Sequence, residues 1–412
     1  MQLLYTIFIE VYGWILTIAS LFHPKAKLWV NGRKKWEEKL AQKISSIDQV
    51  IWMHCSSLGE FEQGRPVLEA LRDEYPNHTL ALSFFSPSGY EVRKNYQGAD
   101  YIFYLPLDSP KNMRRLVELL HPEMLILVKY EYWYNMIEAL DKKKVPIYVI
   151  SAIFRKQQNF FWFDGKNWFA KQLRKITHFF VQNEESKQLL QHIYIDQVTI
   201  SGDTRFDRVK NLLSENFDDE KILHFKNQHH LIVVGSSWPK DEELFLNYFT
   251  QNPLPGNWRL LFAPHEVDEK SIENLQQKFP EAVRYSSYQK EETSSSILLV
   301  DTIGLLNKIY ALADIVYIGG GFGAGIHNTL EAATYGKPII IGPKYQKFQE
   351  AVDQIENKNM ISIRNQKQFD KILRKLMTDS ALRNQMGIIS RNYISNQPLA
   401  TKIILQKLRE MQ

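Results

Sequence analysis

The chain has 412 residues, of which 44% are hydrophobic and 24% are charged, ordinary values for a globular protein that exclude disordered and collagen-like classes. This length can form two domains with a well-buried core. The single cysteine, Cys55, excludes an internal disulfide and fits a reducing compartment.

An apolar stretch at the start of the chain predicts a membrane anchor. Residues 3–22 contain one charged residue, Glu10, and a helix of this length can cross roughly 30 Å of hydrocarbon. No basic region precedes the stretch and no small-residue cleavage site follows it, which favours a retained helix over a signal peptide. Because a charge in mid-bilayer costs about 3 kcal/mol, Glu10 leaves open a helix that lies in the interface. A helix buried in the first domain is the remaining alternative.

A basic segment follows the predicted anchor. Residues 23–43 hold seven Lys or Arg and two Glu, a net charge of +5 that equals the net charge of the whole chain. This position fits the positive-inside rule and attraction to anionic lipid, which would place the remaining chain in the cytoplasm. The remaining chain is neutral and has no RNA- or DNA-binding motif. We therefore expect an anionic membrane surface, and no nucleic acid, as a partner.

The first half alternates short apolar runs with helical patterns, as in an α/β domain. Val50 to His54 predicts a strand, and Glu60 lies in the turn that leads from it into a helix. Met124 to Val128 predicts another strand, and Glu131 follows it. Since the carboxyl ends of parallel strands line the ligand crevice, Glu60 is a candidate general base and Glu131 a second candidate catalytic carboxylate. The alternative for each is a charge that stabilises a helix end.

Residues 154–169 hold seven aromatic side chains mixed with basic ones. Contact with lipid and packing in the core are equally open for this segment. Farther along, the polar residues 211–228 predict a linker between two domains. The predicted organisation is a membrane anchor helix at 1–22, an N-terminal acceptor-binding α/β domain at 23–207, a C-terminal nucleotide-sugar-binding α/β domain at 208–390, and a C-terminal helical segment at 391–412.

A glycine-rich loop dominates the second half. Ile315 to Ile318 predicts a strand, and the seven residues 319–325 contain five glycines, Gly319, Gly320 and Gly321 among them. Glycines let backbone N–H groups turn toward a ligand, and a helix that starts near Asn328 would add the positive end of its dipole. The loop therefore predicts a phosphate site.

His327 and Glu331 are four residues apart, so they would share one face of that helix. A carboxylate one turn from a phosphate suits the hydroxyls of a ribose, which indicates a nucleotide donor. The alternative is a tight structural turn with a packed histidine and a solvated glutamate. No Walker A sequence is present and the spacing is not that of a first Gly-x-Gly-x-x-Gly unit, so a kinase or a dehydrogenase is disfavoured.

The histidines give no sign of a metal site. His265-Glu266 follows a predicted strand, but no second histidine stands at the spacing of a metalloprotease. The eleven histidines of the chain otherwise form no ligand set.

In their order along the chain, these motifs resemble the 3-deoxy-D-manno-octulosonic acid (Kdo) transferases of lipid A biosynthesis, over essentially the whole chain. The matching elements are the N-terminal apolar helix, Ser57-Leu58-Gly59-Glu60, Glu131-Tyr132-Trp133, Gly202-Asp203-Thr204-Arg205-Phe206-Asp207, Asp301-Thr302-Ile303-Gly304, Gly319 to Glu331, and Gly342-Pro343.

The resemblance implies a glycosyltransferase B fold, with two Rossmann-like domains that face a cleft. It implies transfer of Kdo from CMP-Kdo to the lipid A precursor (lipid IVA) at the cytoplasmic face of the inner membrane, with inversion and without a metal cofactor. Glu60 would be the general base, and Arg205 would contact a donor or acceptor anion. The expected donor-binding residues are Ser237, His265, Gly304, Gly319, Gly320, Gly321, His327, Asn328 and Glu331.

The chain departs from the family pattern at one point. The usual Pro-Arg-His-Pro is Pro264-His265-Glu266 here, so the anion contact of that arginine is not expected. Two alternatives remain: a related glycosyltransferase with another nucleotide sugar and a lipid-linked acceptor, and a membrane-tethered nucleotide-sugar-binding protein without catalysis.

Overall fold

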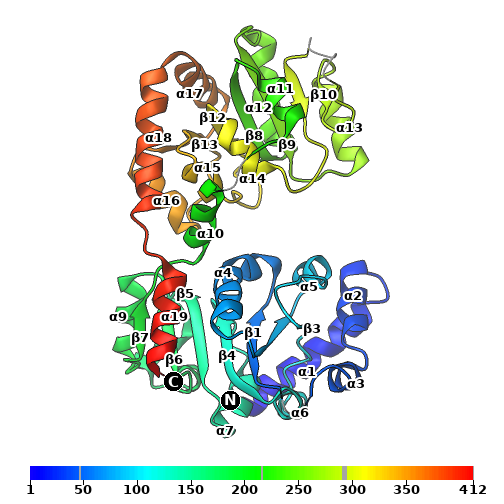
Figure 1. The fold of residues 1–412 in the computed structure, drawn as a ribbon, viewed down its shortest axis with the longest axis vertical. Coiled ribbons are helices and arrows are strands. Elements are labelled where there is room, and N and C mark those ends of the chain that lie inside the picture. Colours follow the sequence, from blue (N-terminus) through cyan, green and yellow to red (C-terminus); the bar gives the residue numbers. More distant parts are fainter. Residues whose placement is uncertain (46–47, 215–216, 290–294, 412) are drawn as a thin grey trace. The chain divides into compact units, whose positions relative to one another are not determined.

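A computed structural model describes residues 1–45, 48–214, 217–289 and 295–411 (Figure 1). The chain forms two compact units. Unit 1 consists of Met1–Asp207 and Pro398–Gln412, and unit 2 consists of Arg208–Gln397. The segment after Gln397 thus belongs to the first unit, together with the N-terminal helix.

Unit 1 is built on a parallel sheet of seven strands in the order β3-β2-β1-β4-β5-β6-β7. The strands are β1 (Val50–Cys55), β2 (Thr79–Phe84), β3 (Tyr101–Tyr104), β4 (Pro122–Val128), β5 (Ile147–Ala152), β6 (His178–Val181) and β7 (Val198–Ile200). All six residues of β1 are buried, as expected for a strand covered on both faces. The strand order reverses between β1 and β4, which is where open α/β sheets bind ligands.

Helices cover both faces of this sheet. They are α1 (Gln2–Ala19), α2 (Pro24–Gly32), α3 (Trp36–Ala41), α4 (Leu58–Glu74), α5 (Pro87–Arg93), α6 (Pro110–Leu120), α7 (Tyr134–Lys142), η1 (Asn159–Gly165), α8 (Trp168–Leu173), α9 (Glu184–His192) and α19 (Ala400–Met411). Helix α10 (Arg205–Asn211) begins in unit 1 and ends in unit 2. Ile404 and Leu408 of α19 pack into the same apolar cluster as Phe61 of α4. The last helix of the chain therefore completes the core of unit 1.

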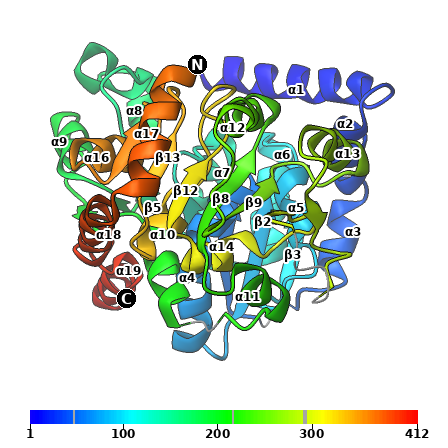
Figure 2. The same cartoon turned by 90° about the horizontal axis from the view of Figure 1, so that it is seen from above.

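Helix α1 runs along unit 1 (Figure 2). Ile9 is 3% exposed, and a Cβ on Gly13 would lie 2.8 Å from Leu107 Cδ2, so this side of the helix packs closely on unit 1. Large apolar side chains cover the rest of its surface and are exposed: Leu3, Leu4, Ile7, Phe8, Val11, Trp14, Ile15 and Ile18. Within the described residues, α1 is the one helix long and apolar enough to cross a membrane. It is not buried in the domain, which removes the third alternative.

The aromatic segment divides between core and surface. Phe154 and Phe160 are buried and pack in the apolar cluster around β5 and β6. Trp162 and Phe163 are 56% and 78% exposed. Core packing therefore accounts for part of this segment, and the tip of η1 lies outside it.

Unit 2 repeats the architecture with the strand order β10-β11-β9-β8-β12-β13-β14, all parallel. Its strands are β8 (His230–Ser237), β9 (Trp258–Pro264), β10 (Val283–Arg284), β11 (Ile297–Leu299), β12 (Ile315–Ile318), β13 (Ile339–Ile341) and β14 (Met360–Ser362). The order reverses between β8 and β12, so the glycine loop that follows β12 lies at the switch point of this sheet.

The helices of unit 2 are η2 (Leu212–Ser214), α11 (Glu220–Lys226), α12 (Pro239–Gln251), α13 (Glu269–Lys278), α14 (Leu306–Ile309), η3 (Tyr310–Leu312), α15 (Leu330–Thr334), α16 (Gln349–Glu356), α17 (Gln366–Thr378) and α18 (Ser380–Ser395). The prediction of a linker at 211–228 is wrong, because η2 and α11 fall inside it; residues 215–216 lie outside the described part. Ile222 and Phe225 of α11 are buried, which explains why a polar segment folds here.

Candidate functional site

Glu60 lies where the sequence predicted it, in the turn from strand β1 into helix α4. Ser57 is the N-cap residue of α4, with an extended backbone, and Glu60 is in the first helical turn. The Ser57 hydroxyl donates a hydrogen bond to the Glu60 carboxylate. Glu60 is partly exposed, so one carboxylate is held at the switch point of the sheet and remains accessible.

Glu131 follows strand β4, the neighbour of β1. Its Oε2 accepts hydrogen bonds from the Ser56 hydroxyl and from Trp133 Nε1 at 2.9 Å, and its side chain is 13% exposed. Adjacent residues Ser56 and Ser57 therefore each bind one of the two predicted carboxylates. The structure brings Glu60 and Glu131 together at the carboxyl ends of two neighbouring strands.

Burial changes the pKa of Glu131 and of the neighbouring His54. It raises the pKa of Glu131 to about 7, with the nearby charge of Glu60 adding to the effect and the Ser56 hydrogen bond opposing it. Burial also lowers the pKa of His54 to about 3. His54 Nε2 lies 3.9 Å from Glu131 Oε2, but a neutral imidazole makes no ion pair. At neutral pH the site thus holds a carboxyl group able to gain or lose a proton.

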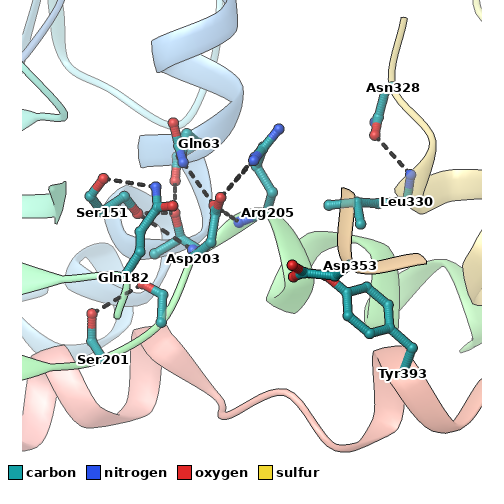
Figure 3. Close-up of polar contacts among 12 residues, drawn as sticks. Gln63, Ser151, Gln182, Ser201, Asp203, Arg205, Asn328, Leu330, Asp353 and Tyr393 are labelled. Atoms are coloured by element: carbon teal, nitrogen blue, oxygen red, sulfur yellow. Dashed lines mark hydrogen bonds and ion pairs between the residues drawn. The ribbon is translucent and has the colours of Figure 1, made fainter. Parts of the chain in front are cut away.

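Arg205 binds the carboxylate of Asp203 in unit 1 (Figure 3). Its Nε and Nη2 donate to Asp203 Oδ2 at 2.9 and 2.7 Å, and Gln63 Nε2 donates to Asp203 Oδ1 at 2.7 Å. Burial opposes the charge of Asp203, but the Arg205 guanidinium outweighs it and lowers the pKa of this carboxyl group. Because Gln63 lies three residues after Glu60 on α4, this network ties helix α4 to the Gly202–Asp207 motif.

The glycine loop of unit 2 packs closely against neighbouring backbone. A Cβ on Gly319 would lie 2.2 Å from the Ser236 carbonyl oxygen, and one on Gly321 would lie 2.6 Å from Gly342 Cα. Gly320 has φ +90°, which favours glycine. Gly320 N–H donates to Asp241 Oδ2 at 2.9 Å, and Gly319 N–H donates to the Gly235 carbonyl at 2.9 Å. These two glycines therefore supply space at the loop, since their N–H groups are used by the protein.

Three rings stack at the carboxyl ends of β8, β9 and β12. The ring of His265 lies 4.7 Å from Trp238 and 4.3 Å from His327, and Trp238 Nε1 donates to His327 Nε2 at 3.1 Å. Burial lowers the pKa of His327 to about 4, and nearby His265 adds to this shift. A neutral His327 that accepts at Nε2 carries its proton on Nδ1. His327 is thus a neutral hydrogen-bond donor next to the glycine loop.

Of the other predicted donor-binding residues, Ser237, Asn328 and Glu331 have polar partners within the protein, and Gly304 lies in open space. The buried Ser237 hydroxyl donates to Glu242 at 3.2 Å. Asn328 Oδ1 accepts from the N–H of Leu330, the first residue of α15, at 3.0 Å (Figure 3). Glu331 lies 3.9 Å from the guanidinium of Arg208. Gly304 has φ +97° and open space around its Cβ position.

One geometric expectation is wrong. Helix α15 begins at Leu330 and has five residues, so His327 precedes it and does not share a helix face with Glu331. Such a short helix also contributes little dipole. Trp238 and Asp241 also contact His327 and the glycine loop, and they were not predicted from the sequence. Their position just after the end of strand β8, at Ser237, could have indicated them.

No group of three or more His, Cys, Asp or Glu side chains in the described ranges has the arrangement of a metal site. The arrangement that is present consists of two carboxylates in unit 1, and a glycine loop with a neutral histidine in unit 2. These groups are suited to proton transfer and to binding of an oxygen-rich ligand.

Comparison with known proteins finds relatives in sequence and in structure. The family described as 3-deoxy-D-manno-octulosonic-acid transferase (kdotransferase) matches residues 34–208. A 3-deoxy-D-manno-octulosonic acid transferase of Chlamydophila psittaci is 28% identical over 326 residues, which is 76% of this chain and 73% of that protein. A bifunctional glycosyltransferase/methyltransferase of Fusobacterium nucleatum is 25% identical over 93% of this chain, and the chain spans 61% of that protein. The crystal structure of Acinetobacter baumannii MurG superposes with a TM-score of 0.57 at 12% identity, over 88% of this chain and 99% of that one.

The two parallel-sheet units and the structural likeness show the glycosyltransferase B fold, as predicted. The sequence matches are more specific. The chain is similar in sequence to several Kdo transferases, and Glu60 and Glu131 lie within the residues that the family matches.

Proposed function

We propose that the protein transfers Kdo from CMP-Kdo to the lipid A precursor, lipid IVA, with inversion at the anomeric carbon. The observation that carries the proposal is the pair of carboxylates, Glu60 and Glu131, held by adjacent serines at the switch point of unit 1 inside the matched family region. In this assignment unit 1 binds the acceptor and unit 2 binds the donor.

In the proposed reaction Glu60 is the general base. It takes the proton of an acceptor hydroxyl while that oxygen forms a bond to the anomeric carbon of Kdo, and the bond between this carbon and the CMP phosphate oxygen breaks. CMP leaves with the electron pair. Glu131, whose pKa is close to 7, lies beside Glu60. It can hydrogen-bond the sugar either as a carboxylic acid, which donates, or as a carboxylate, which accepts. The proposed step needs no metal ion, so a chelator should leave turnover unchanged.

In unit 2 the proposed donor contacts are the Nδ1–H of His327, the space created at Gly319 to Gly321, and Glu331. Gly320→Val should abolish CMP binding, because its side chain would meet the Gly325 carbonyl, 2.4 Å from the Cβ position. Glu331→Ala should weaken CMP binding by about ten- to a hundredfold if this carboxylate holds the ribose. Binding of the acceptor should be unaffected by either change.

We place the protein at the cytoplasmic face of the inner membrane, with α1 in the plane of the interface. The support is the exposed apolar surface of α1, the packing of its other side on unit 1, and the basic residues 23–43. A helix across the bilayer would lose its contacts with Leu107 and Asp108.

The test is CMP release from CMP-Kdo in the presence of lipid IVA, with mass spectrometry of the product. Glu60→Gln should lower turnover by about 10²- to 10⁴-fold while CMP still binds. The control is Glu69→Gln, which removes an exposed carboxylate from the same helix. Undiminished turnover in Glu60→Gln would move the base to another residue, with Glu131 as the next candidate.

A second candidate is the same reaction with another nucleotide sugar and a lipid-linked acceptor. It is favoured by one observation, the absence of the family arginine beside His265. The same assay with a panel of nucleotide sugars decides between the two.

A further inference from the structure

A cavity of about 510 Å³ lies at the surface of unit 1, between helix α1 and the segment that follows it. Its walls include Thr17 of α1, Trp29 and Arg33 at the end of α2, and Leu107. The volume is in the range of sites that hold small molecules, roughly 300 to 1,000 Å³. Exposed apolar side chains of α1, such as Trp14 at 72%, surround its opening. A hydrocarbon chain could enter it from a membrane surface.

Arg33 is a partly buried cation in the wall of this cavity. It donates from Nε to the Leu105 carbonyl at 2.8 Å and from Nη2 to the Phe85 carbonyl at 2.7 Å, and its guanidinium lies over the ring of Trp29 at 3.7 Å. Within the described residues its recorded partners are carbonyls and rings, with no carboxylate. A buried cation without a counter-ion is costly, and an anion from a ligand would relieve that cost.

Two further groups of the wall support an anionic ligand. Lys34 is exposed and lines the same cavity, and the described part of the chain provides it with no ion-pair partner. Trp29 is 7% exposed, and its Nε1–H is buried without an acceptor in that same part. Glu10 of α1 is the one carboxylate in the lining. The lining thus holds two cations, Arg33 and Lys34, and one carboxylate.

The cavity is connected to the candidate catalytic carboxylates. Phe85, whose carbonyl accepts from Arg33, packs against Trp133 with ring centroids 4.5 Å apart. Trp133 in turn donates to Glu131. Two residues, Phe85 and Trp133, therefore link Arg33 in the wall of the cavity to Glu131 by direct contacts.

We propose that this cavity binds one hydrocarbon chain of an anionic lipid, that Lys34 and Arg33 bind its phosphate, and that this lipid is the glycosyl acceptor. The last part rests on the proposed function, and it makes the cavity the site that distinguishes an acylated, phosphorylated acceptor from a free sugar.

The test uses the full-length protein and dodecyl phosphate as the probe, titrated below the concentration at which it forms micelles. We expect binding at least about tenfold tighter than that of dodecyl glucoside, which has the chain but no charge. Lys34→Gln should weaken binding of dodecyl phosphate by about tenfold, the loss of one charge-assisted hydrogen bond. Thr17→Trp, which fills the mouth of the cavity from an exposed position on α1, should abolish it.

Each variant has a matched control. Lys35→Gln removes the same charge one residue farther on, where the lysine pairs with Glu38 and does not line the cavity. Ile18→Trp adds the same ring beside Thr17 at a site that is 61% exposed. Equal losses in a variant and its control, or binding of inorganic phosphate as tight as that of dodecyl phosphate, would overturn the cavity as a lipid site.

The transfer assay then tests the identity of the lipid. Dodecyl phosphate should compete with the acceptor and not with CMP-Kdo, and Thr17→Trp should raise the KM for the acceptor with CMP binding unchanged. Competition against the donor alone would overturn the assignment to the acceptor. Absence of transfer by the unmodified protein would count against the proposed function, whereas the titrations would still decide whether the cavity binds an anionic lipid.

Discussion

The hydroxyl of Tyr5 donates a 2.6 Å hydrogen bond to the buried carboxylate of Asp108. The same carboxylate accepts the backbone N–H groups of Asn135 at 3.1 Å and Met136 at 2.8 Å. Asp108 therefore joins the apolar helix α1 to the start of α7, the helix that directly follows the Glu131-Tyr132-Trp133 segment. The position of α1 is thereby tied to the loop that carries Glu131.

Tyr5→Phe should destabilise unit 1 by about 1 to 3 kcal/mol, because it removes one hydrogen bond to a buried carboxyl group and leaves the ring packing in place. Urea unfolding measures this change. Tyr12→Phe is the control: Tyr12 packs on Trp29 and Phe85, and its hydroxyl makes no hydrogen bond within the described residues. Equal stabilities of the two variants would show that Asp108 does not depend on α1.

Charges on the exposed face of α1 should release the protein from membranes without unfolding it. Phe8 and Ile15 are 64% and 58% exposed, so Phe8→Asp with Ile15→Asp should abolish flotation with anionic vesicles at high salt. At low salt the basic residues 23–43 should retain part of the protein. Ile388→Asp, at an exposed position of unit 2, is the control. Unchanged flotation at high salt would mean that α1 is not the membrane contact.

The sequence predicts the fold well because its strands are continuous apolar runs. Val50 to Met53 and Met124 to Val128 are two such runs, and each is followed by a polar residue, His54 and Lys129. The sequence also predicts that Glu60 and Glu131 meet, since parallel strands place their carboxyl ends on one edge. The hydrogen bond from Ser56 to Glu131 is not predictable in the same way, because it depends on how β1 and β4 are paired, and pairing is a tertiary property.

The errors have physical causes as well. Helix α15 begins at Leu330, after His327, so the four-residue spacing of His327 and Glu331 does not place them on one helix face. The stack of Trp238, His265 and His327 joins residues from three strand ends that are far apart in the sequence. From the sequence, Arg33 is one of several cations in a basic segment that is expected to be solvated. Its partial burial becomes visible only in the structure, where its guanidinium lies over the rings of Phe85 and Tyr104.

Glu131→Gln should change the pH dependence of stability. The folded-state pKa of about 7 lies above the ordinary value, so between about pH 4.5 and 7 the folded state holds a proton that the unfolded state has lost. Stability from this group is therefore fully present below that window and falls as the pH rises through it. Glutamine mimics the protonated form, so the variant should gain about 1 to 3 kcal/mol relative to the unmodified protein between pH 5 and 8. A difference independent of pH in urea unfolding would contradict the raised pKa.

Trp238→Phe should allow the His327 ring to take either tautomer and to gain a proton at Nε2. The variant keeps an aromatic ring to stack on His265 but removes the N–H that donates to His327 Nε2 at 3.1 Å. Protonation of Nε2 in the unmodified protein would set two N–H groups against each other, so the bond favours the neutral ring. We expect the pKa of His327 to rise from about 4 toward the ordinary value, as measured by NMR titration of the ring.

The same variant should also bind CMP less tightly, by a few-fold to about tenfold, because Nδ1 is no longer fixed as the donor. Trp162→Phe, at an exposed position in unit 1, is the control for the loss of an indole. Tight CMP binding together with a raised pKa of His327 would show that the tautomer is fixed for packing alone, and that the donor phosphate is held by other groups of unit 2. An unchanged pKa would show instead that burial, and not the bond from Trp238, keeps the ring neutral.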